Sequence, residues 1–559
     1  MSNISNEGNS IVIQYHLYEL PTVQHKAGLV GLLLFIDAMA EREMYPRPEV
    51  LNVSPTSAKI SFSEESLIKT FNYLYDAVLI EQAVKQKWQG EEPKKVEEII
   101  NSDGKHEKRF VYDTMQPSGN FLEIFYRDGN GIWLKLWRDM LWSVIRNSPK
   151  SRTPYKERLN KKDSSIAKKL WANFLKKCKR PTTLFLENLS SSVLVGAQSC
   201  NTELVDFTGD VVENLLLHFW QITSMVYVPR GVKIVKNKAT GSLEVEREEL
   251  GYVLAIPEPL DLELFVDEYK DLLRNLELND NTFWRPKKAL IDIPAEAGLE
   301  FIYRLASSKA AQKRGLRFCL SSVEIYHLER RRNNVKVHVA DRIVSDRSIL
   351  VAYSRLQEGK YINPLYKSQR IKNILDKKPW YEGMDILLNQ YDWQFFVRVN
   401  GQTPEKIPFF GYNVLKKFSD TEKDLEVFKG DGKMKEKNEA KPLEEQLELL
   451  IYKIVQSYIW AKTDEKSEIK YKSFKDNKDE NQKTKYPPEY FEARAKVCKD
   501  AFLAVRGRKS QAFLDYFTGT ICSIPQYLPA EDYQLVSKAL INDWEKVKTL
   551  TLLAISANS

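Results

Sequence analysis

Residues 137–181 read WRDMLWSVIRNSPKSRTPYKERLNKKDSSIAKKLWANFLKKCKRP, and they hold most of the chain's excess positive charge. Between positions 150 and 180 there are twelve Lys and Arg residues and two acidic ones, an excess of ten. The whole chain of 559 residues has 84 Lys and Arg against 76 Asp and Glu, an excess of only eight. Positive charge that is confined to one stretch is typical of a nucleic-acid contact surface.

The same stretch predicts two helices on either side of a loop. Helical spacing indicates an amphipathic, Trp-rich helix over 132–145, with its tryptophans in a core. Two prolines then interrupt the spacing, so residues 146–158 are expected to form a loop. That loop mixes cations with Asn147 and Tyr155, whose side chains can meet base edges, and we interpret it as a nucleic-acid contact. The alternative interpretation is a solvated basic loop.

The lysine pairs from 161 to 180 follow on a second amphipathic pattern. We interpret them as a track for phosphate groups, because a lysine-rich helix face attracts polyanions of any sequence. An anionic membrane surface is an alternative ligand for such a helix, but its apolar face is small and is needed for packing.

Towards the N-terminus, alternation predicts strands over 11–18 and 58–62, and Thr22 is a suitable N-cap for a helix that is apolar nearly all round. We expect that helix to be buried. In its first turn, Lys26 and the free backbone N–H groups are a candidate phosphate contact, and a solvated helix start is the alternative. Helical spacing continues over 63–86, before a polar, lysine-rich segment.

The rest of the chain predicts a mixed middle region and a helical end. Residues 121–126 are expected to form a strand, and 260–276 a helix. Strands over 316–327 and 335–343 are joined by a strongly basic turn, and the C-terminal part repeats apolar positions at helical spacing. The sequence therefore predicts a multi-domain α+β fold with a C-terminal all-helical bundle. The expected divisions are 1–181, 182–415, a linker over 416–441, and 442–559.

Motifs of the common enzyme classes are missing. The chain has no phosphate-binding glycine loop, no HExxH, no GxSxG and no CxxC pair, and its five cysteines and six histidines are scattered. We therefore expect no catalytic residue, no metal and no cofactor, and a location in a reducing cytoplasm. Two alternatives stay open: a nuclease built from distant carboxylates, and a standalone RNA-binding factor.

Several strings resemble the large subunit of type I CRISPR Cascade complexes, in the branch called the MYXAN subtype. They are WRDMLWSVIRNSPKSRTPYKER (137–158), SSVLVGAQSCNTE (191–203), ENLLLHFWQITSMVYVPRGV (213–232), YVLAIPEPLDLELF (252–265) and VEIYHLERRRNNVKVHVADRI (323–343). The similarity begins near residue 22, continues to about residue 356, and is looser towards the C-terminus.

This resemblance implies a subunit of a guide-RNA surveillance complex, placed where the 5′ part of the RNA is held. Its partners would be the guide RNA, target double-stranded DNA, the Cascade backbone subunits and the subunit that binds the RNA 5′ end. Such a subunit reads the short motif beside the target, helps to open the duplex and offers a basic track to the displaced strand, while guide pairing supplies most of the specificity. A recruited helicase–nuclease, or transposition proteins in a transposon-linked relative, would act afterwards.

The resemblance also directs the choice of site residues. The expected contacts with the motif duplex are Lys26, Arg146, Asn147, Lys150, Arg152, Tyr155, Arg158, Lys161 and Lys162. The expected contacts with the backbone of the guide or of the displaced strand are Arg330, Arg331, Arg332, Arg506, Arg508 and Lys509. No membrane partner is expected.

The C-terminal bundle is expected to resemble the Cascade small subunit, which in several such systems is translated internally from the large-subunit gene. Met434 follows Lys-Gly-Asp-Gly-Lys, whose codons allow a purine-rich ribosome-binding site, so we predict a second product of 126 residues from Met434 to Ser559. A plain linker methionine is the alternative. Expression of the untagged gene should yield this fragment, and Met434→Leu should remove it. A fragment that persists in the Met434→Leu variant would contradict the hypothesis.

Overall fold

The computed structural model describes residues 3–100, 106–126, 131–197, 206–236, 243–276, 284–306, 319–332, 334–357, 363–398, 410–427, 443–474, 476, 486–524 and 528–559. The chain forms two compact units. The N-terminal unit comprises residues 1–230 and 249–345, and the C-terminal unit comprises 231–248 and 346–559. Each unit is described by itself.

The N-terminal sheet confirms the two strands that alternation predicted. It has the order β1-β2-β4-β3, with β1 (Asn3–Glu7), β2 (Ser10–His16), β3 (Glu49–Ser54) and β4 (Ser57–Ser63), all antiparallel. Ile11 faces Phe62, and Ile13 faces Ile60; all four side chains are fully buried. Side chains alternate between the two faces of a strand, so one face of this sheet supplies core residues.

Helix α1 (Val23–Glu41) is the buried helix that the sequence predicted. Thr22 caps it by accepting a hydrogen bond from the backbone N–H of His25. The helix is long and apolar enough to cross a membrane, but most of that span is buried inside the N-terminal unit. It packs against β12 (Tyr252–Pro259), against α8 (Trp220–Thr223) and against the short 3-10 helix Leu215–His218. These contacts on several sides explain why the helix is apolar nearly all round.

The central sheet supports that helix. Its main strands are β10 (Met225–Lys236), β12 (Tyr252–Pro259), β14 (Leu320–Arg331) and β15 (Asn334–Val344), antiparallel in this order, and β13 (Leu290–Ile291) pairs in parallel with β10. The strand β11 (Leu243–Glu249) pairs with β10 in the same sheet. Helix α10 (Pro294–Ala306) packs on β12, β14 and β15, and α9 (Leu262–Arg274) packs against α1 and α10. The predicted helix over 260–276 and the basic β-hairpin are therefore confirmed.

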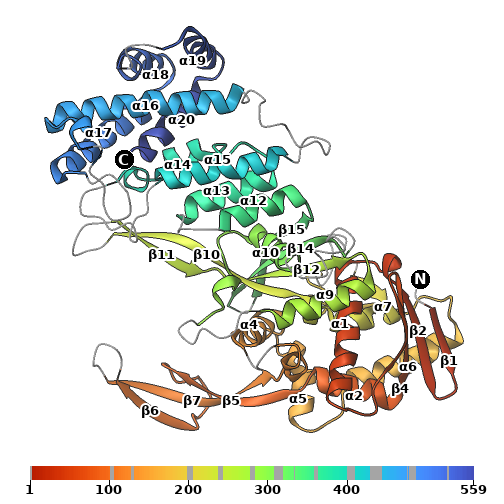
Figure 1. Cartoon of the computed structure of the whole chain (residues 1–559). Coiled ribbons are helices and arrows are strands. Elements are labelled where there is room, and N and C mark those ends of the chain that lie inside the picture. Colours follow the sequence, from red (N-terminus) through yellow and green to blue (C-terminus); the bar gives the residue numbers. More distant parts are fainter. Residues whose placement is uncertain are drawn as a thin grey trace. The chain divides into compact units, whose positions relative to one another are not determined.

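A third sheet corrects the prediction for residues 63–109. Helix α2 (Glu64–Leu74) ends where the expected helix would have continued, and β5 (Ala77–Val84), β6 (Lys95–Ile100) and β7 (His106–Pro117) follow in the order β5-β7-β6. This sheet extends away from helix α5 (Thr153–Leu159) (Figure 1). The apolar positions of 77–84 also fit a helix, but cross-strand rows such as Val84–Phe110–Val96 stabilise the extended form.

The next segment combines a correction with two confirmed helices. Residues 121–126 were expected as a strand, but α3 (Asn120–Glu123) is a short helix that buries Phe121 and Leu122. Helix α4 (Ile132–Met140) continues into a π-helical turn, Leu141–Ile145, and confirms the Trp-rich helix. The loop expected over 146–158 is helical in its second half, because Pro154 lies in the first turn of α5 (Thr153–Leu159), where a proline is tolerated. Helix α6 (Ser165–Lys179) follows, and then β8 (Leu186–Asn188), β9 (Thr208–Asp210) and α7 (Val211–Asn214).

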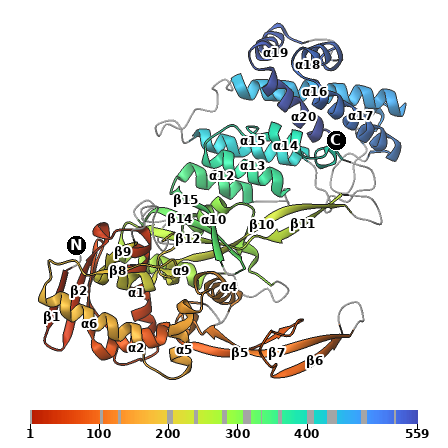
Figure 2. The same cartoon turned by 180° about the vertical axis from the view of Figure 1, so that it is seen from behind.

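The described residues 346–559 of the C-terminal unit are mostly helical, as expected for the end of the chain (Figure 2). Its helices are α12 (Arg347–Gln357), α13 (Pro364–Leu375), α14 (Met384–Gln390), α15 (Tyr412–Val427), α16 (Leu443–Ser467), α17 (Pro488–Gly507), α18 (Ser510–Tyr516), α19 (Ala530–Asn542) and α20 (Trp544–Ala557). Helix α20 packs against α15, α16, α17 and α19. The α+β class with a helical C-terminal part is therefore confirmed.

The four-part division of the chain stays a prediction. Helix α15 occupies residues 412–427, so the first part of the expected linker is helical. Residues 428–442, which include Met434, lie outside the described residues.

Two glycines of α1 predict a sharp effect on stability. A Cβ atom at Gly28 would lie 2.2 Å from the carbonyl oxygen of Leu216, and one at Gly31 would lie 2.2 Å from that of Phe219. Gly28→Ala or Gly31→Ala should therefore destabilise the N-terminal unit by about 1–3 kcal/mol or more, because a close backbone contact must open. Thermal unfolding of the variants measures this loss. Gly507→Ala is the control, because a Cβ there meets no atom within 4 Å.

Candidate nucleic-acid interface

The basic segment 146–162, called the basic loop below, includes helix α5 and begins where the π-helical turn ends. Its first arginine points inward. Arg146 is only 3% exposed, and its guanidinium donates to the backbone carbonyl of Ser192. It also lies over the ring of Tyr75, 5.8 Å from the centroid. The expected DNA contact at Arg146 is therefore a buried side chain that holds the start of the loop.

Arg152 closes the loop back onto the helix that precedes it. Its Nε atom donates to the carbonyl of Arg146 at 2.6 Å, and its Nη2 atom donates to the carbonyl of Trp142 at 2.9 Å. Its guanidinium also stacks 4.1 Å from the centroid of the Trp142 ring. A cation at this position satisfies carbonyls that the end of a helix leaves free. Arg152 therefore stabilises the loop from inside.

An aromatic cluster lies beneath the loop. Tyr155 is buried, and its ring is nearly perpendicular to the rings of Trp142 and Tyr75, with centroid distances of 5.5 and 5.1 Å. Burial raises the pKa of Tyr155, and it raises the pKa of Tyr75 to about 12. The hydroxyl of Tyr75 lies 2.7 Å from Nδ1 of His218, whose pKa falls to about 3 through burial and then through the charge of Arg146. The cluster is an uncharged support for the loop, apart from Arg146.

The remaining residues of the loop face outward. Lys150, Lys161 and Lys162 are exposed, whereas Asn147 and Arg158 are half-buried. The Nη1 atom of Arg158 donates to the carbonyl of Lys162 at 2.6 Å, which ties the end of the loop to α5. The structure thus separates the predicted DNA contacts of this segment into three exposed lysines and a set of side chains that hold them in place.

The predicted phosphate track is partly neutralised within the protein. Lys177 is buried and binds Asp210 at 3.0 Å and the carbonyl of Thr183 at 2.6 Å. Lys169 pairs with Glu187 at 2.9 Å. The track over α6 is therefore less charged than its composition indicates, because tertiary contacts with later segments use part of its charge.

Lys26 is also engaged within the protein. Its Nζ atom lies 2.7 Å from a carboxylate oxygen of Glu258, which also accepts from Ser322 and Arg342. Burial by itself would raise the pKa of Glu258, but the hydrogen bonds from Lys26 and Ser322 hold it below its ordinary value. This ion pair connects α1 to the central sheet, and the phosphate contact expected at Lys26 stays a prediction.

The second predicted set of contacts is divided between the two units. Arg330, Arg331 and Arg332 are exposed at the tip of the β14–β15 hairpin. In the C-terminal unit, Arg506 donates to the carbonyl of Asn389 at 2.8 Å. Arg508 donates to the carbonyl of Ala504 at 2.6 Å and stacks 4.1 Å from the Tyr516 ring, and Lys509 is exposed.

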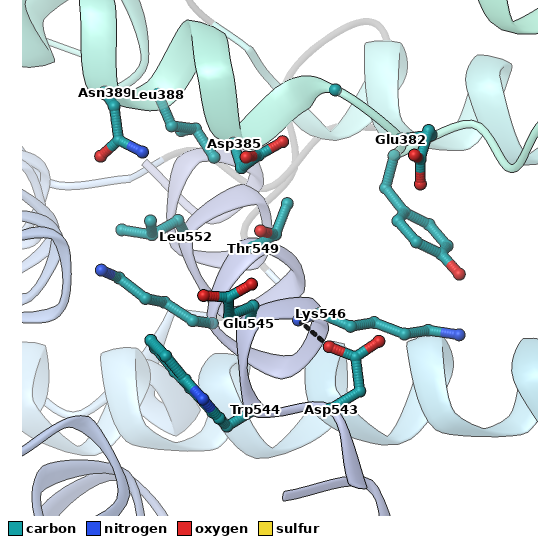
Figure 3. A pocket seen from close by; sticks show the side chains of 13 residues that line it. Glu382, Asp385, Leu388, Asn389, Asp543, Trp544, Glu545, Lys546, Thr549 and Leu552 are labelled. Atoms are coloured by element: carbon teal, nitrogen blue, oxygen red, sulfur yellow. Dashed lines mark hydrogen bonds between the residues drawn. The ribbon is translucent and has the colours of Figure 1, made fainter. Parts of the chain in front are cut away.

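Sequence reasoning missed a cavity of about 460 Å³ between α14 and the start of α20. Figure 3 shows four carboxylate side chains around it, those of Glu382, Asp385, Asp543 and Glu545. Two lysines, Lys546 and Lys548, also line the cavity, so acidic groups outnumber basic ones. This charge disfavours a phosphate ligand. The residues come from segments about 160 positions apart, and only their folding brings them together.

The described residues contain no group of three or more His, Cys, Asp or Glu side chains that could hold a metal ion. Two thiols in the described part of the C-terminal unit, the buried Cys498 and the half-buried Cys522, are poor nucleophiles, because burial raises the pKa of each to about 12. The geometry of the described residues therefore offers a binding surface and provides no support for the nuclease alternative.

Comparison with protein families supplies the decisive observation. Residues 48–315 match the model described as type I-B CRISPR Cas8b N-terminal domain, and residues 320–558 match the type I-B CRISPR Cas8b C-terminal domain. Together the two models span nearly the whole chain. The chain belongs to the Cas8b family. No curated protein matches it.

Cas8b is the large subunit of type I-B Cascade, a non-catalytic subunit that recognises the target-adjacent motif (PAM) in DNA interference. The resemblance to a Cascade large subunit is therefore confirmed at the level of the family. The MYXAN branch is not supported, because both models name type I-B. In this Cas8b chain the basic loop and its aromatic support lie within the part that matches the N-terminal domain.

Two neighbouring lysines of α6 test the distinction between buried and available charge in Cas8b. Lys177→Met should destabilise the N-terminal unit by about 3–5 kcal/mol, because the carboxylate of Asp210 loses its partner in a buried site. Lys176→Met should change stability by less than about 0.5 kcal/mol, because Lys176 is exposed. Thermal or denaturant unfolding of the two variants makes the comparison. Equal stability of both variants would contradict the assignment.

Proposed function

We propose that the basic loop is the surface through which this large subunit holds the PAM duplex. In this proposal Lys150, Lys161 and Lys162 bind phosphates, and Asn147 contacts a base edge. Arg158, which is half-buried, keeps the end of the loop in place. Arg146, Arg152 and Tyr155 act as positioning residues, because their side chains are used inside the protein.

The observation that carries this proposal is the difference between paired and available cations. Lys150, Lys161 and Lys162 are exposed, and within the described residues none of them pairs with a carboxylate. By contrast, the six described Lys and Arg residues between 77 and 117 all pair with a carboxylate. They are Lys85, Lys87, Lys94, Lys95, Lys108 and Arg109. Binding to phosphate releases counterions from the nucleic acid only where the protein's charge is not already neutralised.

A rigid loop suits this role. Phosphate contacts set the orientation of a protein on the duplex, and base contacts then read the sequence. The buried contacts of Arg146 and Tyr155 fix the loop before DNA arrives, so less conformational entropy is lost on binding. From this position the subunit would help to open the duplex and stabilise the R-loop formed by the guide RNA.

Membership of the Cas8b family implies Cascade subunits, the guide RNA and target DNA as partners. The finer partners belong to the proposal: the Cascade backbone subunits, the subunit that binds the RNA 5′ end, and a small subunit from Met434. A recruited helicase–nuclease, or transposition proteins, would act on the opened target. Arg506, Arg508 and Lys509 remain proposed contacts to the backbone of the guide or of the displaced strand. We place the complex in the cytoplasm.

The proposal predicts different effects for phosphate and base contacts. In a guide-loaded complex assembled with this chain, Lys150→Ala, Lys161→Ala or Lys162→Ala should weaken binding to all duplexes alike and reduce the salt slope by about one. Asn147→Ala should instead change the preference at one PAM position by about 1–3 kcal/mol. Titrations of a panel of PAM variants at several salt concentrations measure both effects.

Lys95→Ala is the matched control, because Lys95 is an exposed lysine that pairs with Glu81 at 3.0 Å and with Glu97 at 2.9 Å. It should leave the salt slope unchanged. If all three loop variants behave like Lys95→Ala, the basic loop does not bind the duplex. An unchanged PAM profile for Asn147→Ala would remove that residue from the base-reading group.

A further inference from the structure

The β14–β15 hairpin packs next to the segment that leads into the basic loop. Strand β14 packs against the π-helical turn Leu141–Ile145, which leads directly into the loop. Arg330 of the hairpin is close enough to influence Arg152 of the loop: burial lowers the pKa of Arg152, and the charge of Arg330 lowers it further. Two segments about 180 positions apart in sequence are thus neighbours in the N-terminal unit.

Arg330 and Arg332 of the hairpin tip are not neutralised by carboxylates within the described part of the chain. Arg330 donates to the carbonyl of Arg332 at 3.0 Å, and within the described residues neither side chain pairs with a carboxylate. Arg331 differs, because it pairs with Glu329 at 3.1 Å. Cations that lie close together without acidic partners repel one another, and a polyanion that binds between them removes this repulsion.

We infer that the hairpin tip and the basic loop form one continuous surface for the PAM duplex, on which Arg330 and Arg332 bind phosphates alongside Lys150. This inference rests on the proposed function of the basic loop. It places the hairpin on the duplex, whereas the sequence pattern alone had grouped these arginines with contacts to the guide or the displaced strand.

Two contact points have a mechanical consequence. A single basic loop would hold the phosphate backbone but would leave the duplex free to turn around it. A second cluster, carried on a rigid β-hairpin, fixes the orientation of the duplex and so the base that Asn147 faces. The Arg331–Glu329 pair and the contact of Glu329 with His338 brace the hairpin just before its tip.

The test uses a short duplex that carries the PAM but has no complementarity to the guide, so that no R-loop forms and no strand is displaced. In the guide-loaded complex, Arg330→Ala or Arg332→Ala should reduce the salt slope on this duplex by about one, as Lys150→Ala does. Arg330→Lys should retain the slope, because it retains the charge. Lys95→Ala, whose cation is already paired, is the control and should change nothing.

Three outcomes separate the possibilities. A reduced slope for both Lys150→Ala and Arg330→Ala supports the continuous surface. If Lys150→Ala reduces the slope while Arg330→Ala only weakens binding to a fully complementary target, the hairpin serves the displaced strand or the guide, and the inference is wrong. If neither variant affects the PAM-only duplex, the inference is wrong, and if Lys161→Ala and Lys162→Ala also leave it unchanged, the proposed function of the loop fails as well. Unchanged melting temperatures show that the exposed variants fold.

Discussion

The close contact between helix α1 and the segment 215–223 is the constraint on which the N-terminal unit depends. Gly28 and Gly31 let the helix touch the backbone carbonyls of Leu216 and Phe219, an approach that any larger residue would block. At the start of the helix, the Gln24 side chain binds both backbone groups of Val195, at 3.0 and 2.9 Å. Trp220 donates to the carbonyl of Val193 at 2.8 Å. The segment around 193–195 is thereby fixed to the core.

That fixed segment in turn holds the basic loop. Arg146 donates to the carbonyl of Ser192, and Arg152 donates to the carbonyl of Arg146, so hydrogen bonds connect the segment around 192–195 with the start of the basic loop. Rigid scaffolds that carry short functional loops are a common arrangement for recognition. In this chain the arginines that looked most suited to DNA from their position in sequence are used to build the loop, and the lysines remain available for the ligand.

Much of the fold could be predicted from periodicity. The N-terminal strands, the buried helix after Thr22, the Trp-rich helix, the basic hairpin and the helical C-terminal part all follow from residue patterns that only one type of element can bury. The β5-β7-β6 sheet and the short helix α3 could not be predicted in this way. A short apolar run fits either element, and long-range strand pairing decides between them.

The order of residues is enough to show where positive charge is concentrated and which family the distinctive strings resemble. Which of those charges are available follows from the folded chain. The partners that neutralise Lys177 and Lys26 lie 33 and 232 positions away along the chain, and sequence spacing carries no information about such pairs. The same long-range folding brings β14 against the turn Leu141–Ile145 that leads into the basic loop. Ionic contacts depend on distance in space, so the distribution of paired and unpaired charge becomes visible only when the chain is folded.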